Sequence, residues 1–164
     1  MKILITSDNH GDHEALVNLV LKAGDDIDLF IHCGDSELSE DDTIWGIFHT
    51  VRGNTDYGNY KDAISLNTPE GKIVVTHGHL YGVKQNLKKL VALAKENQAD
   101  VIMYGHTHVM DDQEIDGIKI INPGSIRIPK GNYPYPSFAI LDWQGDKKEV
   151  TFYNADWEVI TEVG

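Results

Sequence analysis

The chain has 164 residues, of which 41% are hydrophobic and 24% charged, so it fits one globular domain over residues 1–164 and excludes a disordered protein. Its 26 acidic and 14 basic residues give a formal net charge of −12, which excludes a duplex nucleic-acid binder with a basic surface. The same charge repels polyanions and favours a small anionic substrate held by local cations.

The single cysteine, Cys33, cannot form a disulfide within the chain. The N-terminal apolar run at residues 3–5 is too short for a signal peptide, and no apolar run approaches the ~20 residues of a membrane-spanning helix. We therefore expect a soluble, cytoplasmic protein that does not contact membranes. The sequence leaves open whether the chain forms a homo-oligomer.

The first two-thirds of the chain alternates predicted strands and helices. The elements in chain order are strands at 2–7 and 29–33 around a helix at 12–23, strands at 47–51 and 64–66, and strands at 73–76 and 101–104 around a helix at 83–96. Each strand–helix–strand succession predicts a βαβ unit with parallel strands.

After residue 110 the helical pattern disappears. Ile115-Asp116-Gly117-Ile118 predicts a hairpin turn, and strands are expected at 118–121, 138–143 and 149–154. We interpret this last third as a β meander. The whole chain then predicts two packed sheets with helices on the outer faces.

Five short motifs place metal-ligating side chains after predicted strands, where ligands bind in open α/β sheets. The residues are Asp8, His10, Asp35, Asn54, His77, His106 and His108. Oxygen and imidazole ligands without a thiolate suit a divalent ion such as Mn, Fe or Zn. This number of ligands exceeds the need of one ion, which indicates two metals and hydrolytic chemistry.

Two motifs contain residues at positions i and i+2, which point to the same side of an extended segment. Asp8 with His10, and His106 with His108, can therefore each reach one small volume. A single histidine at a strand end is more often a capped or solvated side chain. Five motifs at one edge of the sheets favour the metal interpretation, and the neutral side chain of Asn54 would leave the site positive enough for a phosphate ester.

The order of these motifs resembles that of the calcineurin-like metallophosphoesterase superfamily, whose pattern is D-x-H, G-D, G-N-H-(D/E), H and G-H-x-H. Here the pattern reads Asp8-Asn9-His10, Gly34-Asp35, Gly53-Asn54-Thr55-Asp56, His77 and Gly105-His106-Thr107-His108. Asn122-Pro123-Gly124-Ser125 matches a segment common in smaller members. Size and spacing are similar to the compact bacterial and archaeal phosphodiesterase branch.

The resemblance implies a four-layer α/β/β/α sandwich of two mixed β-sheets flanked by helices. It assigns the ligands to two divalent metal ions bridged by Asp35, with Asp8, His10 and His108 on the first and Asn54, His77 and His106 on the second. Manganese is the expected metal, with Fe, Zn or Ni as alternatives. The expected activity is that of a phosphodiesterase acting on small phosphate esters, in which a metal-bridging hydroxide attacks phosphorus.

One residue departs from the family pattern, since Thr55 replaces a histidine that contacts the phosphate and protonates the leaving group in many members. His79, two residues after His77, is a candidate general acid or phosphate contact. The alternative is a solvated histidine that only supports its neighbours. The loops at 58–60 and 132–136 would decide between monoesters and diesters, and their shape cannot be read from the sequence.

Other classes fit less well. The H-x-H-x-D-H pattern of metallo-β-lactamase-type hydrolases is missing after His77-Gly78-His79, and there is no P-loop. The alternative without catalysis is a metal-containing interaction scaffold of the same fold, like the retromer subunit of this superfamily. Such members tend to lose part of the ligand set, which is complete here.

Overall fold

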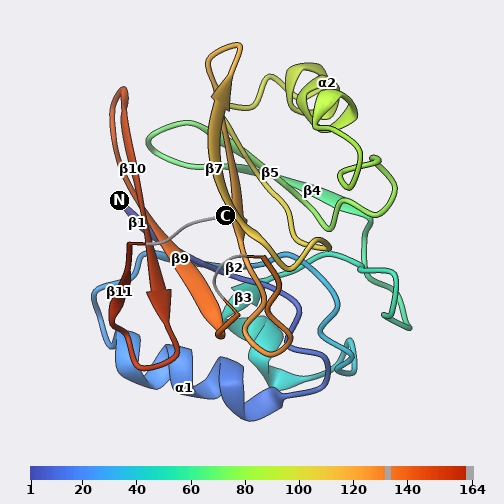
Figure 1. Cartoon of the computed structure of the whole chain (residues 1–164), viewed down its shortest axis with the longest axis vertical. Coiled ribbons are helices and arrows are strands. Elements are labelled where there is room, and N and C mark those ends of the chain that lie inside the picture. The colour runs from blue at the N-terminus through green and yellow to red at the C-terminus, as the bar shows by residue number, and fades with distance from the viewer. Residues whose placement is uncertain (132–133, 162–164) are drawn as a thin grey trace.

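The computed structural model describes residues 1–131 and 134–161. Two β-sheets pack face to face, and a helix covers the outer face of each sheet (Figure 1). Helix α1 (His13–Ala23) packs on the first sheet and helix α2 (Lys88–Glu96) on the second. The predicted four-layer α/β/β/α sandwich is therefore confirmed.

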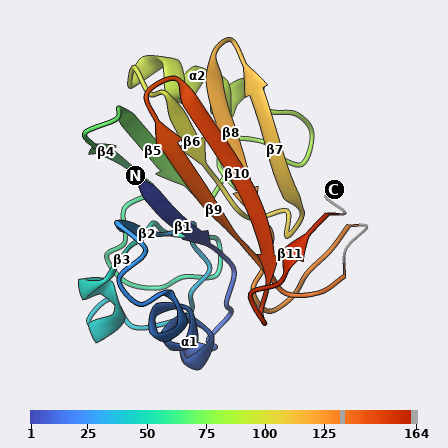
Figure 2. The same ribbon diagram turned by 90° about the vertical axis from the view of Figure 1, so that its left-hand side faces the viewer.

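The first sheet has six strands in the spatial order β11, β10, β9, β1, β2 and β3 (Figure 2). Their bounds in that order are Val159–Ile160, Lys147–Asn154, Ser137–Gln144, Lys2–Thr6, Leu29–His32 and Phe48–His49. Strands β1, β2 and β3 run parallel, whereas β9 is antiparallel to β1 and to β10. A short 3₁₀ helix, Thr43–Gly46, precedes β3.

The second sheet has five strands in the order β4, β5, β6, β8 and β7. Their bounds are Ala63–Asn67, Lys72–Thr76, Val101–Met103, Ile118–Pro123 and Met110–Ile115. Strands β5, β6 and β8 run parallel, and the edge strands β4 and β7 are antiparallel to their neighbours. Both sheets are thus mixed, with parallel strands at the two predicted βαβ units.

Successive side chains of the central strands face different layers of the sandwich. Ile3 and Ile5 of β1 pack between the sheets, whereas Leu4 packs against α1. In β5, Val75 faces the other sheet and Val74 faces α2. Because these strands are buried on both faces, they read as continuous apolar runs in the sequence.

The predicted start of the second helix at residue 83 is wrong, because α2 begins at Lys88. Residues 83–87 form turns and irregular backbone, and the Asn86 Oδ1 accepts a hydrogen bond from Lys88 N at 3.0 Å. Val83 and Leu87 still pack in the core beneath α2. These two apolar residues are spaced in the sequence as they would be on one face of a helix, although the backbone there is not helical.

The predicted β meander is wrong in one respect, because its strands divide between the two sheets. The hairpin turn is confirmed, with Ile115 opposite Ile118, and it joins β7 to β8 in the second sheet. Strands β9, β10 and β11 complete the first sheet. The pattern missed β7 because this edge strand is mostly polar and exposed, and it missed β11 because that strand has two residues.

Among the described residues, no helix combines the length and the apolar character that a membrane crossing requires. Cys33 is a fully buried free thiol directly after β2. Burial raises the pKa of this thiol well above its usual range, so Cys33 is a core residue rather than a nucleophile.

Candidate metal centre

The candidate site lies where the loops after parallel strands meet at one end of the sandwich. The loops after β1 and β2 are joined by a backbone hydrogen bond from Asp8 N to Gly34 O at 3.0 Å. A second bond, from Gly105 N to His77 O at 3.0 Å, joins the loops after β6 and β5. The two βαβ units thus deliver their motif residues to one place.

The predicted ligands converge there in two groups that share one carboxylate. The groups are Asp8, His10, Asp35 and His108, and then Asp35, His77 and His106, each with its ligand atoms within 4.8 Å of one another. Asn54 joins the second group, since its Oδ1 lies 3.1 Å from His77 Nε2 and 3.0 Å from His106 Nδ1. Because Asp35 belongs to both groups, the geometry suits a ligand shared between two ions.

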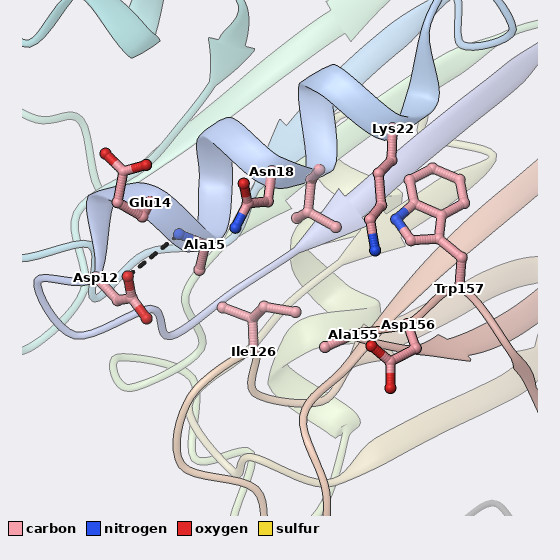
Figure 3. A pocket seen from close by; sticks show the side chains of 10 residues that line it. Asp12, Glu14, Ala15, Asn18, Lys22, Ile126, Ala155, Asp156 and Trp157 are labelled. Atoms are coloured by element: carbon pink, nitrogen blue, oxygen red, sulfur yellow. Dashed lines mark hydrogen bonds between the residues drawn. The ribbon is translucent and has the colours of Figure 1, made fainter.

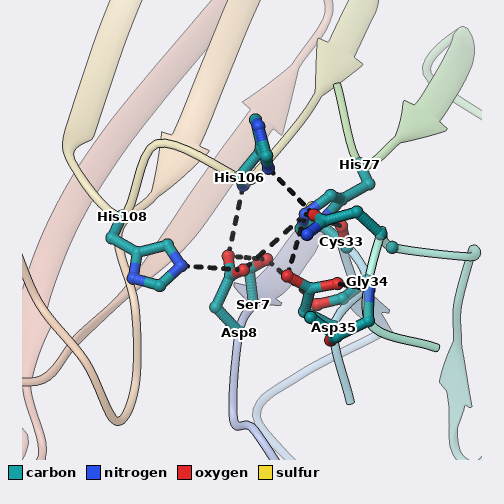
Figure 4. Close-up of polar contacts among 12 residues, drawn as sticks. Ser7, Asp8, Cys33, Gly34, Asp35, His77, His106 and His108 are labelled. Atoms are coloured by element: carbon teal, nitrogen blue, oxygen red, sulfur yellow. Dashed lines mark hydrogen bonds and ion pairs between the residues drawn. The ribbon is translucent and has the colours of Figure 1, made fainter. Parts of the chain in front are cut away.

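Asp8 lies at the centre of the cluster, between His108 and Asp35 (Figure 4). Its Oδ2 accepts hydrogen bonds from Ser7 Oγ at 2.5 Å and from His106 N at 3.3 Å. Its Oδ1 is buried and makes no hydrogen bond to any described residue, although His108 Nε2 lies 3.2 Å away. A buried carboxylate oxygen without a donor is costly unless a cation binds it, so this atom fits a metal ligand.

Three imidazoles of the cluster are oriented through their Nδ1 atoms. His77 Nδ1 donates to the Cys33 carbonyl at 2.7 Å, His108 Nδ1 donates to the Ile128 carbonyl at 2.6 Å, and His10 Nδ1 lies 2.5 Å from the Glu37 carboxylate. Each Nε2 then faces the carboxylates of the cluster. Metal-binding histidines commonly have this arrangement, in which the second ring nitrogen donates to a carbonyl or carboxylate.

The pKa values of the cluster shift in both directions. Burial would lower the pKa of His77 and of His108, but hydrogen bonds and charges from Asp35 and Asp8 raise both. Burial would raise the pKa of Asp35, but hydrogen bonding to His77 and Thr55 and the His77 charge hold it well below its usual range. Burial, together with the charges of His77 and Lys84, lowers the pKa of His106 to about 4. An ionised carboxylate and a neutral imidazole are the forms that bind metal.

The backbone is strained at the ligands themselves. The angle φ is positive at Asp8 (58°), His10 (42°), Asp35 (57°), His106 (70°) and His108 (61°). Such conformations cost side-chain-bearing residues roughly 1–3 kcal/mol each, and they concentrate at functional sites. This strain therefore supports a functional role for the cluster independently of its chemistry.

Close packing of the loops requires a glycine at one position in particular. A Cβ on Gly53 would lie 2.0 Å from Asp35 Oδ1. The neighbouring Asp56 carboxylate accepts hydrogen bonds from Gly53 N at 2.7 Å, Asp35 N at 2.9 Å and Glu37 N at 2.9 Å. Asp56 therefore holds the Asp35 loop in place without joining the ligand groups.

The Asn122-Pro123-Gly124-Ser125 segment supports the cluster from the end of β8. The Asn122 Nδ2 donates to the Gly105 carbonyl at 3.0 Å and to Thr107 Oγ1 at 3.0 Å. The Ser125 Oγ donates to the Asp8 carbonyl at 2.9 Å. The segment thus fixes the two loops that carry Asp8 and His106.

His32 connects the loops after β1 and β2, although it belongs to none of the sequence motifs. Its Nε2 donates to Asn9 Oδ1 at 2.8 Å, and its Nδ1 accepts a hydrogen bond from Gly34 N at 3.0 Å. The residue is fully buried, and burial lowers its pKa to about 4. Its position at a strand end, just before Gly34-Asp35, was the one available signal.

His79 and Thr55 lie at the edge of the cluster. The His79 ring centroid is 5.4 Å from that of His77 and 6.1 Å from that of His106. Among the described residues nothing hydrogen-bonds to the buried His79 Nδ1 or to Thr55 Oγ1. Thr55 N donates to Asp35 Oδ1 at 3.0 Å, so the threonine occupies the expected place beside the ligands.

The two loops that the sequence predicts to shape the site lie at residues 58–60 and 132–136. A hollow of about 460 Å³, which includes Gly58 of the predicted 58–60 loop, is lined by Glu37, Glu40, Thr55 and Tyr57. The other predicted loop, 132–136, lies partly outside the described residues. The 58–60 loop therefore contributes Gly58 to a hollow whose acidic side chains are Glu37 and Glu40.

Another pocket, of about 380 Å³, lies between α1 and the turn before β11 (Figure 3). Its lining mixes the acidic Asp12, Glu14 and Asp156 with Lys22 and the apolar Trp157 ring. Asp12 serves as the N-cap of α1, accepting from Ala15 N at 3.2 Å. This pocket contains none of the predicted ligands.

Comparison with known proteins agrees with this geometry. The model of the calcineurin-like phosphoesterase superfamily domain matches residues 1–146. The chain is 42% identical over 155 residues to the probable metallophosphoesterase YsnB of Bacillus subtilis, covering 94% of this chain and 91% of YsnB. It is 38% identical over 103 residues to the phosphodiesterase YfcE of Escherichia coli, covering 56% of this chain and 50% of YfcE.

A solved structure shares the whole fold. The crystal structure of a conserved uncharacterized protein and predicted phosphoesterase from Streptococcus pneumoniae matches with a TM-score of 0.94 and 32% identity. The match covers 99% of this chain and 94% of the other. The arrangement of the two sheets is thus shared with a solved structure.

Proposed function

Because the chain belongs to the calcineurin-like phosphoesterase superfamily, we propose that it is a phosphodiesterase that hydrolyses small phosphate esters with two divalent metal ions. Its relatives support the coarser statement of a metal-dependent phosphoesterase. The observation that carries the finer proposal is the convergence of all predicted ligands in two groups sharing Asp35. The unpartnered Oδ1 of Asp8 supports it further.

In this proposal Asp8, His10 and His108 hold one ion, Asn54, His77 and His106 hold the other, and Asp35 contacts both. Two such ions, with Mn as the first choice, would supply a hydroxide nucleophile near neutral pH and neutralise the phosphate charge. The chain's own residues position this chemistry through the Nδ1 hydrogen bonds to Cys33 and Ile128.

His79 is the proposed contact to the phosphate or the leaving group. Its Nδ1 is buried without a partner among the described residues, and its ring lies beside His77 and His106. Thr55 lacks a group that donates a proton efficiently near neutral pH. We therefore expect esters with good leaving groups to turn over faster than alkyl esters.

The test is hydrolysis of bis-p-nitrophenyl phosphate by metal-stripped protein before and after Mn is added. The expected result is Mn-dependent turnover that His77→Ala abolishes, with two Mn bound per wild-type chain by elemental analysis. Absence of turnover with two metals bound would overturn the hydrolytic proposal and leave the metal-containing scaffold as the better interpretation.

A further inference from the structure

A pocket of about 460 Å³ shares the loop after β6 with the ligand cluster. Thr107, which stands between the proposed ligands His106 and His108, forms part of its wall, and Lys84 and Lys130 form another part. Neither lysine forms an ion pair with any residue in 1–131 or 134–161. Two lysines without an ion-pair partner among these residues therefore line a pocket beside the candidate metal centre.

The pocket is also lined by one carboxylate, that of Asp111, so its two lysines and one aspartate give it a formal charge of +1. Asp111 accepts hydrogen bonds from the Tyr104 hydroxyl at 2.8 Å and from Gln113 Nε2 at 2.9 Å. The remaining lining is the Tyr104 ring with the apolar side chains Val83, Val109 and Met110. An apolar wall with cations at its edge suits an organic group that carries a negative charge.

The electrostatic environment is unequal around the cluster. The hollow lined by Glu37 and Glu40 is acidic, and Glu37 contacts the proposed ligand His10, whereas the pocket that includes Thr107 carries the two lysines. Lys130 adjoins a proposed ligand directly, because its backbone N donates to the His108 carbonyl at 3.0 Å. A substrate with a second anionic group would therefore be directed toward the lysines and away from the glutamates.

We propose that Lys84 and Lys130 bind a second anionic group of the substrate, so that the preferred substrates are phosphate esters with a carboxylate or phosphate on one arm. This proposal rests on the hydrolytic function proposed above and names its substrate class. It accounts for how a chain with a net charge of −12 selects a multiply charged small molecule.

The test compares two ligands that differ by one carboxylate, benzylphosphonate and 4-carboxybenzylphosphonate, by calorimetric titration into Mn-loaded protein. Two exposed ion contacts of about 0.5 kcal/mol each make the carboxylated ligand bind roughly fivefold tighter to the wild type. The double variant Lys84→Gln/Lys130→Gln is expected to bind both ligands equally, whereas Lys84→Arg/Lys130→Arg keeps the preference. Lys88→Gln, an exposed lysine outside this pocket, is the matched control and also keeps it.

Equal binding of both ligands by wild-type protein that hydrolyses bis-p-nitrophenyl phosphate would overturn the substrate class and leave the hydrolytic function standing. A preference that persists in the glutamine variant would likewise overturn the assignment to these lysines. Failure of the Mn-loaded wild type to bind either phosphonate, with turnover of bis-p-nitrophenyl phosphate retained, would overturn the substrate class alone, whereas loss of that turnover with two metals bound would overturn the hydrolytic function.

Discussion

Asp8 destabilises the metal-free fold but suits metal binding. Its Oδ1 is buried without a hydrogen-bond donor among the described residues, so in metal-free protein this one oxygen is left unsatisfied although Oδ2 accepts two hydrogen bonds. His108 Nε2 lies 3.2 Å away and can accept a hydrogen bond from an amide placed there. An asparagine at position 8 could therefore donate a hydrogen bond to His108 Nε2, where the Asp8 Oδ1 has no donor.

We predict that Asp8→Asn stabilises the metal-free protein by about 1 kcal/mol and lowers Mn-dependent turnover at least about 100-fold. Urea unfolding near pH 8, in chelator and then in excess Mn, measures both effects. The wild type should gain stability from Mn, and the variant should gain much less. A variant that is less stable than the wild type in chelator would contradict this account of Asp8.

At the scale of elements, His32 links the loops that leave β1 and β2. Burial lowers its pKa to about 4, against about 6.5 in an unfolded chain. Between these values the unfolded chain binds the proton more readily than the folded one. The stability contributed by neutral His32 is therefore complete above about pH 6.5 and is lost as the pH falls toward 4, by about 3 kcal/mol in all.

His32→Gln removes this titration while an amide can still donate to Asn9 and accept from Gly34. We expect the variant to be less stable than the wild type near pH 8 and the difference to shrink as the pH falls to about 5, because only the wild type loses stability by protonating this side chain. Urea unfolding of both proteins across this range gives the difference, and the exposed His49→Gln serves as control. A difference that does not change with pH would exclude the proposed role of His32.

The site residues that the sequence predicts are marked by short motifs next to predicted strands. Those that it does not predict are brought together only by the tertiary fold. Asp8, Asp35 and His106 follow buried strands directly, so strand pattern and motif order were enough to bring them together. The pocket that contains Lys84 and Lys130 depends on a turn before α2 and on a segment after β8, which no local pattern relates. The start of α2 was misplaced for a similar reason, since Val83 is apolar because of tertiary packing rather than helical periodicity.

At the scale of the whole molecule, the net charge of −12 sets which anions can approach. A small ester experiences mainly the nearby cations, whereas a longer polyanion must lie along an acidic surface. We predict that the rate per phosphodiester linkage falls several-fold between a dinucleotide and a single-stranded 12-mer in ~0.01 M salt, where the screening length is ~30 Å. At ~0.15 M salt the length shortens to ~8 Å and the gap should narrow. Steady-state hydrolysis of both substrates at the two salt concentrations measures this, and a 12-mer that is cleaved faster at low salt would contradict selection of small anions by the charge of the protein.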